Sequence, residues 1–199
     1  MGDYKPLAGS NYFPLPRKLR DIGAIINPKN KAQKCFLYCI LMSLHPIKTN
    51  PKRVTKYSKW IDEVKMGDVP FPVQLNKIPK IEKLNDFSIN VFSFEDNEYF
   101  PLYVSDKVGA HHVNLMLLEK KGKNHYVYIK NLNRMLNALT KHNGKCFYCP
   151  RCLHRFSNKR LLKNHANDCA MRSPLRLKPT TIKHFNLRIG STLEKYKES

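Results

Sequence analysis

The sequence predicts an α+β fold, in which helical segments come first and a mostly antiparallel sheet follows. Apolar residues recur at helical spacing over 34–46, where Pro46 marks the end, and 53–64 predicts a second helix. After residue 85 the chain turns to short runs rich in Val, Ile, Tyr and Phe, separated by turn-like DN and KGK sequences; these runs are 88–94, 98–104, 112–118 and 125–131. Helices followed by consecutive strands are typical of an α+β domain.

The connecting segments complete a domain that we expect to cover residues 1–144. Prolines and basic residues scattered over 4–34 favour extended segments and turns. Residues 70–79 read as a loop that leads into a short helical piece ending at Leu84, and 133–139 predicts a short helix or turn. Beyond this domain we expect a small module at 145–170 and a basic tail at 171–199.

The formal charge of +21 is high for 199 residues and is unevenly placed. Residues 145–199 hold 13 Lys and Arg against 3 Asp and Glu, an excess of 10 in 55 residues. Such an excess favours phosphate backbones or another acidic partner over a neutral ligand. A soluble cationic surface without a dedicated ligand is the alternative.

No membrane partner is expected, because the longest apolar run, at 35–44, is too short to span a bilayer. The N-terminus has no apolar signal core. Four of the six cysteines have metal-ligand spacing and the other two lie one helical turn apart, which favours a reducing compartment. We therefore expect an intracellular protein, in the nucleus rather than the cytoplasm.

A C-x2-C-x12-H-x3-C spacing predicts one structural zinc ion in the small module. Tetrahedral zinc takes four sulfur or nitrogen ligands, here two from a hairpin and two from one helix face. The predicted ligands are Cys149, Cys152, His165 and Cys169. Phe156 and Leu162 supply the small core of a ββα zinc finger, Ser157 is placed to cap its helix, and Cys146 is left as a free thiol.

The finger helix does not predict base reading. The positions that would face base edges are Asn158, Leu161 and Asn164, and leucine can neither donate nor accept a hydrogen bond. Phosphate contacts are expected instead from five cations: Arg151, Arg155, Lys159, Arg160 and Lys163. The alternative is a finger that packs against the neighbouring domain.

A cysteine and a histidine suggest a second site, a catalytic one. Cys35 begins the apolar helix, where the helix dipole lowers a thiol pKa, and His125 opens a strand much later in the chain. This is the layout of papain-like and OTU-like cysteine peptidases. Asn131 is excluded as the residue that orients His125, because it would lie roughly 20 Å away on one straight strand.

A partner for His125 would have to come across the sheet, from Asn114 or His112. The alternative is that Cys35 and Cys39 are small apolar residues on a buried helix face. In that case His125 alternates with Val127 and Ile129 on the inner face of its strand. The sequence leaves the two interpretations open.

Four segments follow one another along the chain: GSNYFPLPRKL (9–19), AIINPKNKAQKCFLYCILMSLHP (24–46), HYVYIKNLNRML (125–136) and CPRCLHRFSNKRLLKNHANDC (149–169). In this order they resemble the region that precedes the exonuclease and polymerase domains in Maverick/Polinton-type, protein-primed family B DNA polymerases of mobile elements. The resemblance covers about residues 5–190. Residues 181–199 resemble the lead-in to the exonuclease, but neither the exonuclease carboxylates nor the polymerase aspartates follow. Nucleotidyl transfer requires carboxylates that hold metal ions, so the resemblance implies a truncated relative without polymerase activity.

The sequence thus predicts a zinc-finger module associated with nucleic acid, which binds DNA mainly through phosphate contacts. A papain-like or OTU-like cysteine peptidase that uses Cys35 and His125 is the alternative. A segment that docks on a polymerase body is a third interpretation.

Overall fold

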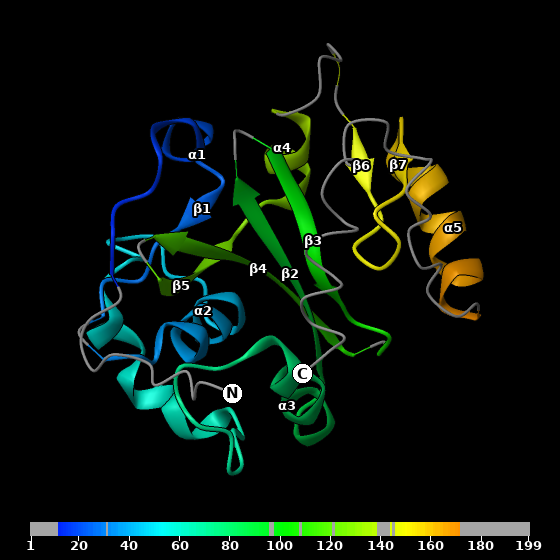
Figure 1. Cartoon of the computed structure of the whole chain (residues 1–199). Helices are drawn as coiled ribbons and strands as arrows, with labels where there is room; N and C mark the ends of the chain where they lie inside the picture. The colour runs from blue at the N-terminus through cyan, green and yellow to red at the C-terminus, as the bar shows by residue number, and fades with distance from the viewer. Residues whose placement is uncertain are drawn as a thin grey trace, which may run out of the picture.

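The computed structural model describes residues 12–30, 32–95, 98–107, 109–120, 122–138, 144 and 146–171. Its centre is a five-stranded sheet with the order β1-β5-β4-β2-β3. The strands are β1 (Ile25–Ile26), β2 (Phe87–Glu95), β3 (Glu98–Val104), β4 (His111–Lys120) and β5 (Lys123–Ile129). Their pairings are antiparallel except that β2 and β4 run parallel, so the sheet is mixed. The predicted α+β class is confirmed (Figure 1). The sheet is mostly antiparallel, as predicted, but it contains one parallel pair, β2 with β4.

One face of the sheet is covered by α2 (Cys35–Leu44), the 3-10 helix η1 (Val54–Glu63), the short η2 (Leu75–Lys77) and α3 (Ile78–Leu84). The alternate residues of β4 that point to this face include Val113 and Leu115, and both are fully buried there. Helix α2 is apolar over nearly its whole surface and is buried along most of its length, which explains why it lies against the sheet at the centre of this layer.

The other face is covered by α1 (Arg17–Ile22), α4 (Leu132–Asn137) and part of the C-terminal module. Met116 and Val127, which alternate with the residues of the first face, are fully buried in this second core. The sheet is therefore buried on both sides, and neighbouring residues of a central strand belong to different cores.

Helix α1 and strand β1 were not predicted, η2 forms inside the predicted loop at 70–79, and the predicted helix at 53–64 differs in kind. Helix α1 follows Pro16 and ends at Gly23, whose φ of 65° is the left-handed conformation common just after a helix. Strand β1 has only two residues, paired with the edge of β5. The predicted 53–64 helix forms as 3-10 turns. The predicted tail at 171–199 lies outside the described residues except for Met171, the last residue of α5 (Lys159–Met171).

Candidate metal centre

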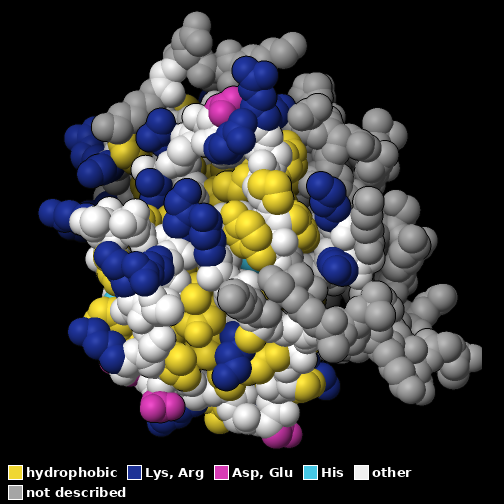
Figure 2. All heavy atoms as spheres, turned by 90° about the vertical axis from the view of Figure 1, so that its left-hand side faces the viewer, with side chains coloured by type: hydrophobic (Ala, Val, Ile, Leu, Met, Phe, Trp, Pro, Cys, Tyr) yellow, Lys and Arg dark blue, Asp and Glu magenta, His cyan; other side chains and the backbone are white. Residues whose placement is uncertain are grey.

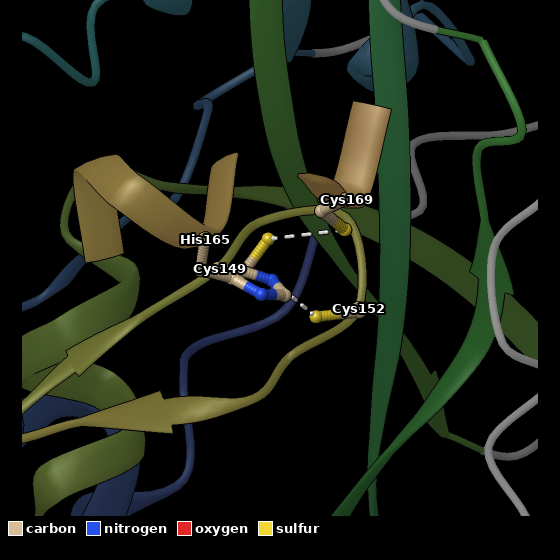
Figure 3. Close-up of side chains that lie close together, drawn as sticks. All are labelled: Cys149, Cys152, His165 and Cys169. Atoms are coloured by element: carbon tan, nitrogen blue, oxygen red, sulfur yellow. Dashed lines mark hydrogen bonds between the residues drawn. The ribbon is translucent and has the colours of Figure 1, made fainter. Parts of the chain in front are cut away.

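The four predicted metal ligands come together at the end of a hairpin and along one helix. Strands β6 (Phe147–Tyr148) and β7 (Arg155–Phe156) pair antiparallel, and α5 follows. Cys149 and Cys152 lie in the turn between the strands, while His165 and Cys169 lie one turn apart on α5 (Figure 3).

The ligand atoms of these residues all lie within 4.8 Å of one another. The Sγ atoms of Cys149 and Cys169 are 3.9 Å apart, and the Cys152 Sγ lies 3.1 Å from the His165 Nε2. A tetrahedral ion with metal–sulfur bonds of about 2.3 Å separates two sulfurs by about 3.8 Å. The Cys3His group can therefore hold one metal ion with little rearrangement.

The turn that carries the two hairpin cysteines is fixed by its own backbone. The amide of Cys149 donates to the His154 carbonyl at 3.0 Å, and the amide of Leu153 donates to the Cys149 carbonyl at 2.8 Å. Leu153 has a φ of 58°, a conformation that costs free energy for a leucine. Its side chain packs against the second core of the sheet, which offsets that cost.

Electrostatics at the site favour a cation. The hydrogen bond between the thiols of Cys152 and Cys149 lowers the pKa of Cys149 to about 4 and raises that of Cys152. Burial is the largest cause of the raised pKa of Cys169, followed by the charge of Cys149. Without a cation the group thus accommodates one thiolate, whereas a divalent ion stabilises several at once.

Aromatic contacts and a helix cap support the ligands. The ring of Phe156 lies 4.8 Å from that of His165, as expected for the small core of the module. Asn158 caps α5, since its Oδ1 accepts from the amide of Leu161 at 2.9 Å, so the prediction that Ser157 is the cap was wrong. The same hydrogen bond occupies one of the positions that were considered for base reading.

The module packs on the α+β domain, as the alternative interpretation expected. The fully buried Asn90 of β2 donates to the carbonyl of Pro150 and accepts from the amide of Ser105. From α4, Asn133 accepts from the amide of Tyr148 at 2.8 Å. These contacts tie the metal-binding turn to the sheet. Nothing in the sequence pattern had marked Asn90 or Asn133.

The five cations considered for phosphate contacts do not share one environment. Arg151 is half-buried and donates to the carbonyl of Cys169, so its guanidinium is part of the module's own structure. The other four, Arg155, Lys159, Arg160 and Lys163, are exposed. Leu161, which lies among them, is 43% exposed.

Cys35 and His125 are not brought together, because the sheet separates their side chains. The Cys35 Sγ accepts from the amide of Tyr126 at 3.4 Å, and the Tyr126 side chain packs in the core on the α2 face. His125 is the preceding residue of the strand, so its side chain points to the opposite face. Its strand partner there is Leu118, which belongs to the second core. The geometry required of a cysteine peptidase is absent for this pair.

The protonation of both residues fits a structural role. Burial raises the pKa of the Cys35 thiol, so the thiolate is disfavoured despite its place at the start of a helix. Burial also lowers the pKa of His125 to about 4, which keeps its ring neutral. The His125 Nε2 lies 2.7 Å from Oδ1 of Asn27, whose amide donates to the Phe13 carbonyl. His125 thus anchors the N-terminal segment on the sheet.

The residues weighed as orienting partners for His125 have other contacts. The Asn131 Oδ1 caps α4 by accepting from the amide of Arg134 at 2.9 Å. The His112 Nδ1 lies 2.6 Å from the Ser88 Oγ, and burial lowers the pKa of His112 to about 4. Asn114 pairs in register with Asn90 of the parallel strand. The actual partner, Asn27, lies just after an edge strand that the sequence did not predict.

Among the residues that the structure describes, no helix is both long and apolar enough to cross a membrane. Comparison with protein-family models, curated proteins and solved structures found no match to the chain.

Proposed function

We propose that this chain is a zinc-binding module that associates with nucleic acid through phosphate contacts, and that it descends from the N-terminal region of a mobile-element DNA polymerase. The observation that carries the proposal is the Cys3His group of Cys149, Cys152, His165 and Cys169. Three sulfurs and one imidazole nitrogen in a tetrahedral arrangement are the donor set of structural zinc sites, and the hairpin followed by a helix supports a ββα finger.

A structural role for the ion is supported by the position of the ligands. Cys149 and Cys169 are only 3% and 7% exposed, so the site has little room for a substrate. All four positions are filled by side chains of the chain itself, whereas a catalytic zinc keeps one position for water. The ion would hold α5 against the hairpin and thereby fix the turn that docks on Asn90.

Nucleic acid is supported as the partner by charge. The chain carries +21, and four cations stand exposed on the finger. Leu161 at the centre of the helix face, and Asn158 engaged as the cap, leave little for base-edge hydrogen bonds. Binding would thus depend on phosphates, with weak sequence preference and strong salt dependence.

The test uses the full chain purified from zinc-supplemented medium. We expect one zinc per chain by elemental analysis. Affinity for a random duplex should fall steeply between 50 and 200 mM salt, as expected from phosphate contacts alone (Kd about 10⁻⁴–10⁻⁶ M at physiological salt). A scrambled duplex of equal length should bind equally well. A metal-free, folded protein would remove the zinc proposal, and a Kd above about 1 mM at low salt would remove the nucleic-acid proposal.

A further inference from the structure

A long part of the α+β domain contains cations without any acid. Residues 22–61 are 40 residues with eight Lys and Arg and no Asp or Glu, between Asp21 and Asp62. Ordinary domains are about one-quarter charged with both signs present, so an acid-free segment of this length is unusual. This segment is longer than the basic stretch of the finger helix.

The fold gathers six of these cations although they come from two separate segments. The amide of Lys29 donates to the carbonyl of Lys52 at 2.9 Å, and Lys29 and Arg53 form an isolated parallel bridge. The Lys56 Nζ donates to the Thr49 carbonyl at 2.6 Å, which closes the loop that leads into η1. We call the resulting set the basic surface; it consists of Lys29, Lys48, Lys52, Arg53, Lys56 and Lys59.

The charges of the basic surface are not neutralised locally. All six are exposed except Lys56, which is half-buried. The ion pairs within the described ranges involve Arg17, Arg20, His45 and Lys80, and so none of the six. The nearby carboxylate of Glu63 lies 2.6 Å from the His45 Nε2 and is engaged there. Figure 2 shows many Lys and Arg side chains on this side of the molecule and few acidic ones.

The surroundings of Trp60 indicate what kind of polyanion fits. Its ring is stacked on that of His45 at 4.0 Å, and the Lys59 Nζ lies over the ring at 4.3 Å. Both neighbours occupy the aromatic surface that would otherwise stack on an unpaired base, so the Trp60 ring is not a free platform for a single strand.

A membrane surface fits less well. Apolar side chains also reach this side of the molecule (Figure 2), but the large ones within the described part of 22–61 are buried or half-buried. Peripheral membrane binding requires apolar area to insert as well as cations. A duplex backbone requires cations alone and carries one charge per about 1.7 Å of its axis.

We propose that the basic surface is the main duplex-binding surface of this protein, and that it contacts the sugar–phosphate backbone without reading sequence. This inference rests on the proposed association with nucleic acid and deepens it. In Figure 1 the η1 segment (cyan) lies at the lower left and α5 (orange) at the right, on opposite sides of the sheet domain. The basic surface and the finger cations can therefore be tested separately.

Three triple variants with the same change in charge test this assignment. Lys48→Gln/Lys52→Gln/Arg53→Gln changes the basic surface. Lys159→Gln/Arg160→Gln/Lys163→Gln changes α5, and Lys65→Gln/Lys77→Gln/Lys83→Gln changes exposed lysines before and within the η2–α3 region. Binding of a 20-base-pair random duplex to each full-length protein is measured by fluorescence anisotropy from 50 to 300 mM salt. Circular dichroism and zinc content establish that each variant is folded.

Each phosphate contact contributes about 0.9 to the slope of log K against log salt concentration. The basic-surface triple is expected to lose about 2.7 of that slope, with the largest loss of affinity. The α5 triple and the triple that changes Lys65, Lys77 and Lys83 are each expected to lose less than about 1. Wild-type protein should bind duplex more tightly than an equally long single strand, and more tightly than phosphatidylserine vesicles.

The outcomes separate the two proposals. Wild-type protein that fails to bind duplex at low salt removes the proposed function itself. Wild-type protein that binds, together with a basic-surface triple whose slope is unchanged or falls no more than that of either comparison triple, overturns the inference alone. Tighter binding to single strands or to the vesicles than to duplex overturns it as well.

Discussion

Two groups of cysteines in this chain differ in whether a histidine side chain lies beside them. Cys149, Cys152 and Cys169 meet His165 in a compact group that can hold a metal ion. Cys35 and Cys39 lie fully buried on α2. His125, the predicted partner of Cys35, has its side chain on the other side of the sheet. The first group lies within 21 consecutive residues, whereas Cys35 and His125 are separated by 90 positions. Spacing along the chain is enough to bring the ligands of the first group together. Whether Cys35 meets His125 depends instead on which face of the strand the His125 side chain occupies.

The largest expected effect is loss of the metal site. In a Cys146→Ser background, so that no spare thiol can substitute, Cys152→Ser should lower bound zinc from one ion per chain to nearly none. The module should unfold as a consequence, because structural zinc in fingers contributes about 10–16 kcal/mol of apparent binding free energy. Elemental analysis and proteolysis of the 146–171 region measure both effects.

The matched control for that experiment is Cys146→Ser alone, which should keep one zinc. Cys39→Ala should also keep it, since Cys39 is buried on α2. Stoichiometric zinc in the Cys152→Ser protein would show that the group of four is not the site.

The second effect is a pH dependence of stability that comes from His125. Its folded pKa is about 4 because of burial, below the unfolded value of about 6.5. Its contribution is therefore complete above pH 6.5 and is lost as the pH falls toward 4, by up to about 3 kcal/mol. His125→Gln can still donate to Asn27 but does not titrate, so its urea-unfolding free energy should fall less between pH 7 and 4.5.

Zinc release at low pH affects the wild type and the variant alike, so the difference between them isolates His125. His45→Gln, at a half-buried position in contact with Trp60, serves as the control. An identical decline for His125→Gln and wild type would mean that His125 is not buried as a neutral ring.

A smaller effect is expected where the module docks on the sheet. Asn90→Ala removes the donor to the Pro150 carbonyl and the acceptor for the buried amide of Ser105. Unpaired buried polar groups cost about 1–3 kcal/mol, measured as a lower urea-unfolding free energy, while zinc content should not change. Asn76→Ala at an exposed position should change stability by less than about 0.5 kcal/mol, and an equal effect of both substitutions would contradict the docking role.

The smallest effect concerns Cys35, for which the sequence suggested a catalytic role with His125. Cys35→Ala should cost about 1 kcal/mol as an ordinary core substitution. In the zinc-loaded wild type, iodoacetamide should modify the half-buried Cys146 and leave Cys35 unmodified, because burial both shields its thiol and raises its pKa. If mass spectrometry finds Cys35 alkylated as fast as Cys146, the prediction that the Cys35 thiol is shielded and unreactive is wrong.

The sequence by itself determined whatever depends on neighbours along the chain. The apolar repeat of 34–46 predicted α2, and runs rich in Val, Ile, Tyr and Phe predicted β2 to β5 within one or two residues at each end. The ligand group followed from spacing, because i and i+4 on a helix share a face and the hairpin turn brings its two cysteines to one point. The short α1 was missed although Pro16 and Gly23 mark its ends.

Only the tertiary structure decided the rest. Successive residues of a strand point to opposite faces of the sheet. Where both faces are apolar, no local pattern shows which of them α2 will cover. In the fold, α2 covers the face opposite His125, so Cys35 and His125 lie on different sides of the sheet. The parallel pairing of β2 with β4 requires β3 to lie at the sheet edge, a matter of long-range order. Asn90 meets Pro150, and Lys29 meets Arg53, only because distant segments pack together, so both the docking of the metal module and the basic surface are products of the fold.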